Sequence, residues 1–148
     1  MSGLFLAAGL LAALASPRLS AEVVVLSDVP LRGGHLRAKL VVRNAGLVPV
    51  RIGTLVGQSG GGGDGWREQT FHPDWFKSDA PSSERSAAAV VTLKPGEEWS
   101  VPIEYDGLRD TGGRIRIEAA FETGPGFATR HRTWAGRVEA KPDVVEVK

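Results

Sequence analysis

One serine of this chain lies in a pattern that hydrolases use. Gly57-Gln58-Ser59-Gly60-Gly61 satisfies Gly-x-Ser-x-Gly, the elbow that presents a nucleophilic serine between a strand and a helix. Two further glycines follow, and each glycine costs about 1 kcal/mol of helix propensity relative to alanine. The sequence therefore predicts a flexible loop at Ser59, and we expect no catalytic residue and no enzymatic activity.

The residues that could bind metals are not spaced as metal ligands. The chain has no cysteine, which excludes disulfides, thiolate nucleophiles, zinc fingers and type 1 copper sites. None of the three histidines is paired at ligand spacing with another, and Asp64, Asp74 and Asp79 lack the spacing of a calcium loop. We expect neither a metal nor a cofactor. The histidines are His35, His72 and His131.

A long connection rich in glycine and aromatic residues is the most informative segment. It runs from Gly57 to Ser86, and connections of this length are usually functional or disordered. We expect its glycine-rich first part to be mobile and its aromatic part to dock on the domain. The docked rings are expected to form either a lid over one end or an exposed platform for a protein segment or a sugar. They are Trp66, Phe71, Trp75 and Phe76.

Arginines and a tryptophan near the C-terminus form a second candidate binding surface. If a five-residue loop at 123–127 joins two strands, Arg116 faces Trp134 and Glu118 faces Arg132. These pairs allow a cation–π contact and a salt bridge. The alternative is a solvated sheet face that resists edge association. Arg116, Arg132 and Trp134 are the candidate binding residues.

The N-terminal segment resembles a secretion leader. Residues 4–15 are a run of about twelve mostly apolar residues, too short for the roughly twenty that span a membrane. Small residues predict cleavage after Ala15 or before Glu22, and we assign residues 1–21 to a signal peptide. We expect a periplasmic or secreted protein with no integral membrane span after cleavage. The lack of cysteines favours a bacterial envelope.

Composition bounds the rest of the chain. Its 148 residues are 42% hydrophobic and 24% charged, which is typical of one globular domain. From Glu22 onward the acidic and basic residues balance, so nucleic acid is not an expected partner.

Hydrophobic residues alternate with polar ones over short stretches separated by Pro and Gly, a period typical of strands. We predict an all-β fold without helices, an immunoglobulin-like antiparallel β-sandwich of about seven strands with one long Gly/aromatic loop. The sandwich is assigned to residues 22–141, and residues 142–148 to an edge strand or a tail. The predicted strands are 22–26, 35–44, 48–56, 88–93, 99–105, 114–122 and 127–138.

Two segments resemble known domains. The corner from Leu40 to Val50, with Asn44-Ala45-Gly46 as its turn, resembles that of bacterial immunoglobulin-like and adhesion-type domains. The turn Leu93-Lys94-Pro95-Gly96-Glu97, followed by an alternating strand, resembles their later half. A narrower resemblance is to the bacterial intracellular proteinase inhibitor domain, which also places an aromatic insertion, here 66–76, before such a turn.

The function we expect is a non-enzymatic exported domain that mediates protein–protein contact in the cell envelope, with a partner the sequence does not identify. One alternative is a carbohydrate-binding module in which the loop tryptophans stack on sugar rings. Another is a domain similar to a protease inhibitor.

Overall fold

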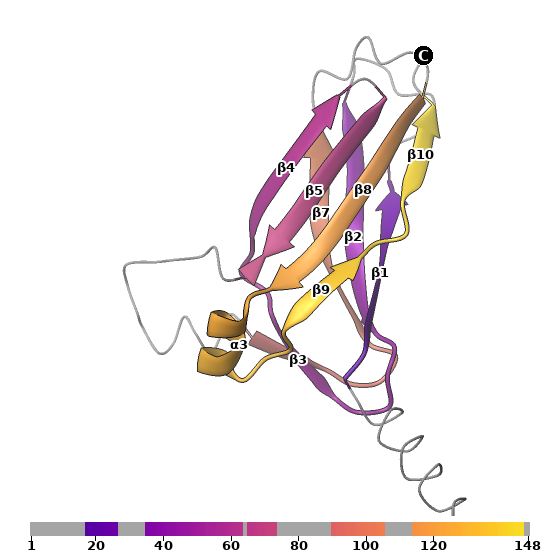
Figure 1. Ribbon diagram of the computed structural model, residues 1–148. Helices are drawn as coiled ribbons and strands as arrows, with labels where there is room; N and C mark the ends of the chain where they lie inside the picture. The colour runs from indigo at the N-terminus through magenta and orange to yellow at the C-terminus, as the bar shows by residue number, and fades with distance from the viewer. Residues whose placement is uncertain (1–16, 27–34, 64, 74–89, 106–113, 147–148) are drawn as a thin grey trace, which may run out of the picture.

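The computed structural model describes residues 17–26, 35–63, 65–73, 90–105 and 114–146, and most of these form β-strands (Figure 1). The described residues contain ten strands and one short helix. In chain order they are β1 Leu19–Val25, β2 Leu36–Asn44, β3 Val50–Gly53, β4 Gly57–Gly63, β5 Trp66–His72, β6 Val90–Leu93, β7 Glu98–Tyr105, β8 Arg114–Thr123, α3 Pro125–His131, β9 Gly136–Glu139 and β10 Asp143–Glu146.

Two sheets face each other around one hydrophobic core. The three-stranded sheet has the order β1-β2-β7, and the larger sheet has the order β10-β8-β5-β4, with β9 also paired to β8. A small pair, β3 and β6, extends one end. Figure 1 shows the larger sheet in front of β2 and β7, with β4 as its outermost strand on one side. The fold is therefore all-β, as the period-two pattern predicts.

The predicted alternation places the correct residues in the core. On β2, Leu36, Ala38, Leu40 and Val42 are buried, and the polar residue Arg37 between them is exposed. The central strand of the larger sheet, β8, follows the same rule. Its buried core residues are Ile115, Ile117, Ala119 and Phe121. Side chains of successive strand residues point to opposite faces, so the apolar residues of each strand lie on one face. These two faces, one from each sheet, pack against each other in the core.

The larger sheet is mixed, which the sequence did not predict. β5 and β8 pair in parallel, from Trp66 opposite Arg116 to Phe71 opposite Phe121, whereas the other strand pairs are antiparallel. The chain visits β6 and β7 between these two strands, and such a crossover is what a parallel pair requires.

The predicted loop at 57–86 is wrong over its first part. Residues 57–63 form β4, and the strand pairs with β5 from Gly57 opposite His72 to Gly63 opposite Trp66. Glycine has a low β-propensity, but the pairing with β5 supplies the hydrogen bonds that its own preference does not. This hairpin and the edge strand β10 raise the number of strands to ten, above the predicted seven.

The prediction of a strand over residues 127–138 is also wrong. Residues 125–131 form α3, which begins with Pro125 in its first turn and ends at Arg132 in the left-handed conformation. Proline favours this position because its fixed φ suits a helix and its missing N–H is not needed there. β9 begins only at Gly136, so Arg116 does not face Trp134, and Glu118 does not face Arg132. Arg116 instead lies between Trp66 and Val144.

Strands form both ends of the described domain. β1 begins at Leu19, three residues before the predicted start of the domain at Glu22, and it pairs with β2 from Asn44 onward. β10 is the edge strand that was one of two options for the C-terminal residues. Among the described residues, no helix is long and apolar enough to cross a membrane.

Candidate functional site

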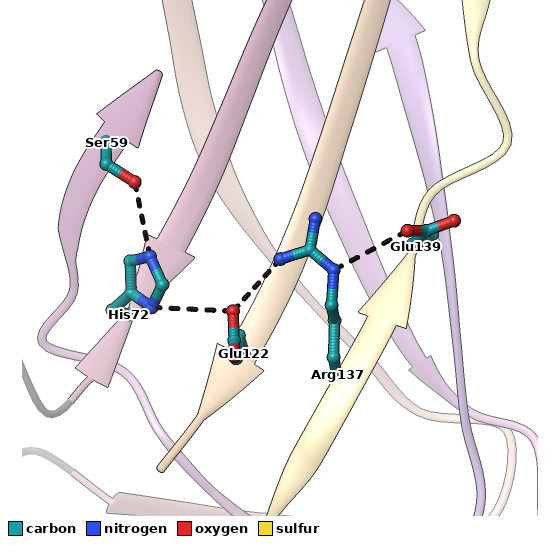
Figure 2. A network of polar contacts seen from close by, with 5 residues as sticks. All are labelled: Ser59, His72, Glu122, Arg137 and Glu139. Carbon is teal, nitrogen blue, oxygen red and sulfur yellow. Dashed lines mark hydrogen bonds and ion pairs between the residues drawn. The ribbon is translucent and has the colours of Figure 1, made fainter. Parts of the chain in front are cut away.

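A chain of polar contacts crosses the outer face of the larger sheet. The Oγ of Ser59 on β4 lies 3.3 Å from Nε2 of His72 on β5. The other ring nitrogen, Nδ1, lies 4.0 Å from Glu122 Oε2 on β8. Arg137 on β9 donates from Nη1 to the same Glu122 oxygen at 2.9 Å, and its Nε lies 3.5 Å from Glu139 Oε1. Figure 2 shows that the five side chains form one continuous network across four neighbouring strands.

The network contains a serine, a histidine and a glutamate, the three residue types of a catalytic triad. In a triad the carboxylate holds the histidine by a hydrogen bond, which requires about 2.6–3.2 Å between heavy atoms. Here Glu122 Oε2 lies 4.0 Å from Nδ1 of His72, beyond that range, and accepts a hydrogen bond from Arg137. Ser59 lies within β4, not at a turn between a strand and a helix. The geometry favours a polar ladder that ties four strands together.

A groove between the two sheets lies beside the β4 edge. Its volume is about 630 Å³, and four glycines of β4 form much of its lining. Tyr105, at the end of β7, belongs to the opposite sheet, while Arg67, Glu68 and Gln69 come from β5. The lining glycines are Gly60, Gly61, Gly62 and Gly63.

The register explains why this part of the sheet is open. Arg67 is paired with Ile117 and Gln69 with Ala119, so both side chains belong to the face that carries the core. Their partners on β4 are Gly62 and Gly60, which have no side chains to fill the space between the sheets. A Cβ on Gly62 would lie 2.6 Å from Cδ of Arg67, so the arginine already occupies that position. Glycine on β4 and polar side chains on β5 together produce the groove.

Backbone carbonyl groups hold Arg67 in place. Its Nη1 donates to the carbonyl oxygens of Gly63 and Trp66, each at 2.8 Å. No other hydrogen-bond acceptor for this guanidinium lies among the described residues. A guanidinium has five N–H donors, so Nε and Nη2 keep donors for a ligand.

Two polar atoms at the groove lack a hydrogen-bond partner among the described residues. They are the hydroxyl of Tyr105 and the side-chain oxygen of Gln69, both shielded from solvent. Burial raises the pKa of Tyr105, and the positive charge of Arg67 lowers it by a smaller amount. The phenol is therefore neutral at neutral pH and available as a donor. Because buried polar groups are almost always paired, these two atoms are open to a partner from outside the described residues.

Of the predicted binding residues that the structure describes, Trp66 and Arg116 lie opposite each other in the parallel pair of β5 and β8, and the others do not join them. Trp66 is 41% exposed on the outer face of the larger sheet, whereas Phe71 is buried in the core. Arg116 donates from Nε to Glu118 at 2.8 Å on the outer face. The predicted site residues Trp75 and Phe76 lie outside the described residues.

The other two predicted binding residues lie around α3. Arg132 ends that helix, and Trp134 stacks on Phe121 with ring centroids 6.0 Å apart. The ring of Trp134 therefore packs against the core.

The groove could not be identified from the sequence. The alternation on β7 predicts that Tyr105 faces inward, which is correct because the ring packs against the core. The Asp64-Gly65 pair between these two segments is a dipeptide typical of two-residue hairpin turns, but the glycine run before it has no alternating pattern that would predict a strand. Without the hairpin of β4 and β5, Arg67 and Gln69 cannot be placed opposite Tyr105. The usable signals were this dipeptide and the predicted inward-facing hydroxyl residue at the end of a strand.

The described residues contain no group of three or more His, Asp or Glu side chains that could hold a metal ion. Comparison of the whole chain with protein-family models, with curated proteins and with solved structures finds no match.

Proposed function

We propose that this chain is an exported, non-enzymatic, immunoglobulin-like domain of a bacterial envelope that binds a segment of another protein along β4. Two facing sheets around one core support the architecture, and the leader-like N-terminus supports export. The observation that carries the binding proposal is the composition of the β4 edge.

Strands at the edge of a sheet present unpaired backbone groups, and proteins protect them with charged residues, proline or bulges. Three edges of the two larger sheets have such protection. β1 carries Glu22, β7 carries Glu98, Pro102 and Glu104, and β10 carries Asp143 and Glu146. β4 has the sequence GQSGGGG, with neither charge nor proline, and among the described residues it pairs only with β5.

An unprotected edge can be extended by a strand from a partner. In strand addition, main-chain hydrogen bonds supply affinity and pockets for alternate side chains supply specificity. The glycines of β4 have no side chains that would obstruct an approaching backbone, and the groove beside them offers a pocket. Both requirements of this binding mode therefore meet at one edge.

The test is selection of peptides from a randomised decapeptide library on the full chain, followed by hydrogen exchange. We expect the selected peptides to slow exchange of the amides at 57–63 and to leave those of β7 and β10 unchanged. Peptides that leave exchange at 57–63 unaltered would refute the proposal.

Two proline variants provide a second test. Successive strand residues direct their N–H groups to opposite sides, so either Gln58→Pro or Ser59→Pro replaces an N–H that faces away from β5. The variant that keeps native stability should lose peptide binding, and the matched control Ser59→Ala should retain it. Binding that survives in both proline variants would show that the edge is not used.

A second candidate function, carbohydrate binding, rests on Trp66 alone. Its indole lies over Gly63, where an added Cβ would be 2.8 Å from Nε1, and the side chain keeps substantial exposure. An exposed aromatic ring is what stacking on a sugar needs. Quenching or enhancement of tryptophan fluorescence by β-linked oligosaccharides, abolished in Trp66→Ala, would favour this function. The described residues give no separate support to the protease-inhibitor alternative.

A further inference from the structure

The groove beside β4 lies where the inward side chains of an added strand would be. Side chains of a strand paired with β4 would alternate between the outer face of the sheet and the space between the two sheets. The inward positions of β4 are Gln58, Gly60 and Gly62, because their partners on β5 belong to the core face. An inward residue of an added strand beside the two glycines would therefore enter the groove.

The groove has the chemistry of a carboxylate site on its inner side. Arg67 is fixed by two carbonyl oxygens and still has N–H donors on Nε and Nη2. The neutral phenol of Tyr105 lines the same groove, and the charge of this guanidinium acts on its pKa. Glu68 also lines the groove, but its register partner Glu118 places it on the opposite face of β5. An inward side chain of the added strand would therefore meet the positive charge of Arg67 and not the negative charge of Glu68.

We infer that the groove receives the carboxylate of an Asp or Glu side chain carried by the extended segment that pairs with β4. Arg67 donates to the carboxylate through the N–H groups that the backbone leaves free, and the Tyr105 hydroxyl gains an acceptor. This inference rests on the strand addition proposed above and names the chemistry of the partner.

A second copy of this chain does not fit the groove. If β4 paired with β4 of another copy, the inward side chains would be Gln58 and hydrogen atoms of glycine, and none of them carries a charge. The side-chain amide of Gln58 from the second copy would then be the one hydrogen-bonding group available to both the oxygen of Gln69 and the phenol of Tyr105. The charge of Arg67 therefore points to a different protein as the occupant.

The test uses three heptapeptides, acetyl-Thr-Val-Thr-X-Thr-Val-Thr-amide, in which X is Glu, Gln or Lys. Binding to the ¹⁵N-labelled full chain is followed by the shifts of amide resonances, which detect weak complexes. We expect the Glu peptide to bind about tenfold more tightly than the Gln peptide, because hydrogen bonds to a charged group are worth more than neutral ones. The Lys peptide should bind most weakly.

Variants then assign the preference to the groove. Arg67→Gln should reduce the difference between the Glu and Gln peptides to less than twofold. Arg43→Gln, which removes a positive charge on β2 that pairs with Glu98, should leave the difference unchanged. Tyr105→Phe should weaken the Glu peptide severalfold without lowering stability, because the hydroxyl has no partner to lose among the described residues. A residue with only a structural role would lower stability instead.

The outcomes separate this inference from the proposed function. If Glu and Gln peptides bind equally and both shift the resonances of 57–63, strand addition stands and the carboxylate site is refuted. If no peptide shifts these resonances, strand addition at β4 is itself refuted. If Arg67→Gln fails to fold, Tyr105→Phe decides, since unchanged affinity for the Glu peptide in that variant would overturn the inference.

Discussion

Asn44 holds the corner between β2 and β3. Its Nδ2 donates to the carbonyl oxygens of Val48 and Leu93, at 2.7 and 2.8 Å, and its Oδ1 accepts from the N–H of Gly46 at 2.9 Å. The side chain is almost fully buried. The sequence predicts a turn here because Asn and Gly tolerate a positive φ, but neither residue has one. The prediction of a turn is correct, but side-chain hydrogen bonds stabilise the turn, not a positive φ.

We expect Asn44→Ala to lower the free energy of unfolding by about 3 kcal/mol, since it removes three hydrogen bonds and leaves buried carbonyls without donors. Urea denaturation followed by far-UV circular dichroism measures this loss. Arg43→Ala is the matched control, because its exposed ion pair with Glu98 should contribute less than about 1 kcal/mol. Equal losses in the two variants would show that Asn44 does not hold the corner.

Tyr105 offers a pH test, because it is the only tyrosine in the chain. Its pKa is raised above the ordinary value of 10.0, chiefly by burial. The folded protein therefore keeps the proton after the unfolded chain has lost it. The stabilising effect is fully present below pH 10 and is lost as the pH rises through the raised pKa. Tyrosinate absorbance at alkaline pH should titrate later in the native protein than in urea.

Two variants check the causes of this shift. Arg67→Gln should raise the pKa of Tyr105 further, since the charge of Arg67 lowers it. Tyr105→Phe should remove the part of the alkaline loss of stability that this phenol causes. A native titration that coincides with the one in urea would contradict the burial of the phenol beside the groove.

At the scale of elements, the alternating strands could be predicted and the glycine-rich and helical segments could not. β2 and β8 carry their own signal, because every second residue is apolar and buried. β4 carries none, since its glycines become a strand only through pairing with β5. The sequence of α3, PGFATRH, is short and lacks an apolar period, so tertiary contacts decide its conformation. One such contact is Phe127, which packs close to Gly53 and Pro73.

The end of α3 provides a prediction for this element. Arg132 adopts φ 54° and ψ 52°, a left-handed conformation that costs a non-glycine residue roughly 1 kcal/mol or more. We expect Arg132→Gly to raise the free energy of unfolding by up to about 1 kcal/mol, measured by thermal or urea denaturation. Arg130→Gly removes the same charge inside the helix and should instead destabilise by a similar amount. A loss of stability in Arg132→Gly would contradict the assigned cap.

At the scale of the whole molecule, the alternation specifies two sheets around a core but not which strands are neighbours. Phe71 and Phe121 lie opposite each other in the parallel pair of β5 and β8, although fifty residues separate them in the sequence. Their apolar character predicts burial, and nothing local predicts the pairing. For the same reason the groove depends on the topology: Arg67 and Tyr105 meet only because β5 and β7 belong to facing sheets.

The folded domain begins before Glu22, because β1 starts at Leu19. Leu19 and Ala21 pack against the core. The backbone just before Glu22 is also engaged, since Ala45 N donates to Arg18 O at 2.9 Å and Lys141 N to Ala21 O at 3.0 Å. Cleavage of a leader before Glu22 would remove these contacts and the first three residues of β1. Cleavage after Ala15 leaves the strand whole, so the fold favours the first of the two predicted sites.

We therefore expect the protein exported by a bacterial host to begin at Ser16, as measured by intact mass and N-terminal sequencing of the periplasmic fraction. A form made to begin at Glu22 should be less stable than one that begins at Ser16 by roughly 2 kcal/mol or more, because it lacks the packed side chain of Leu19. An intact Met1 in a soluble cytoplasmic fraction would reject the leader. A mature protein that begins at Glu22 with undiminished stability would show instead that the first residues of β1 are dispensable to the fold.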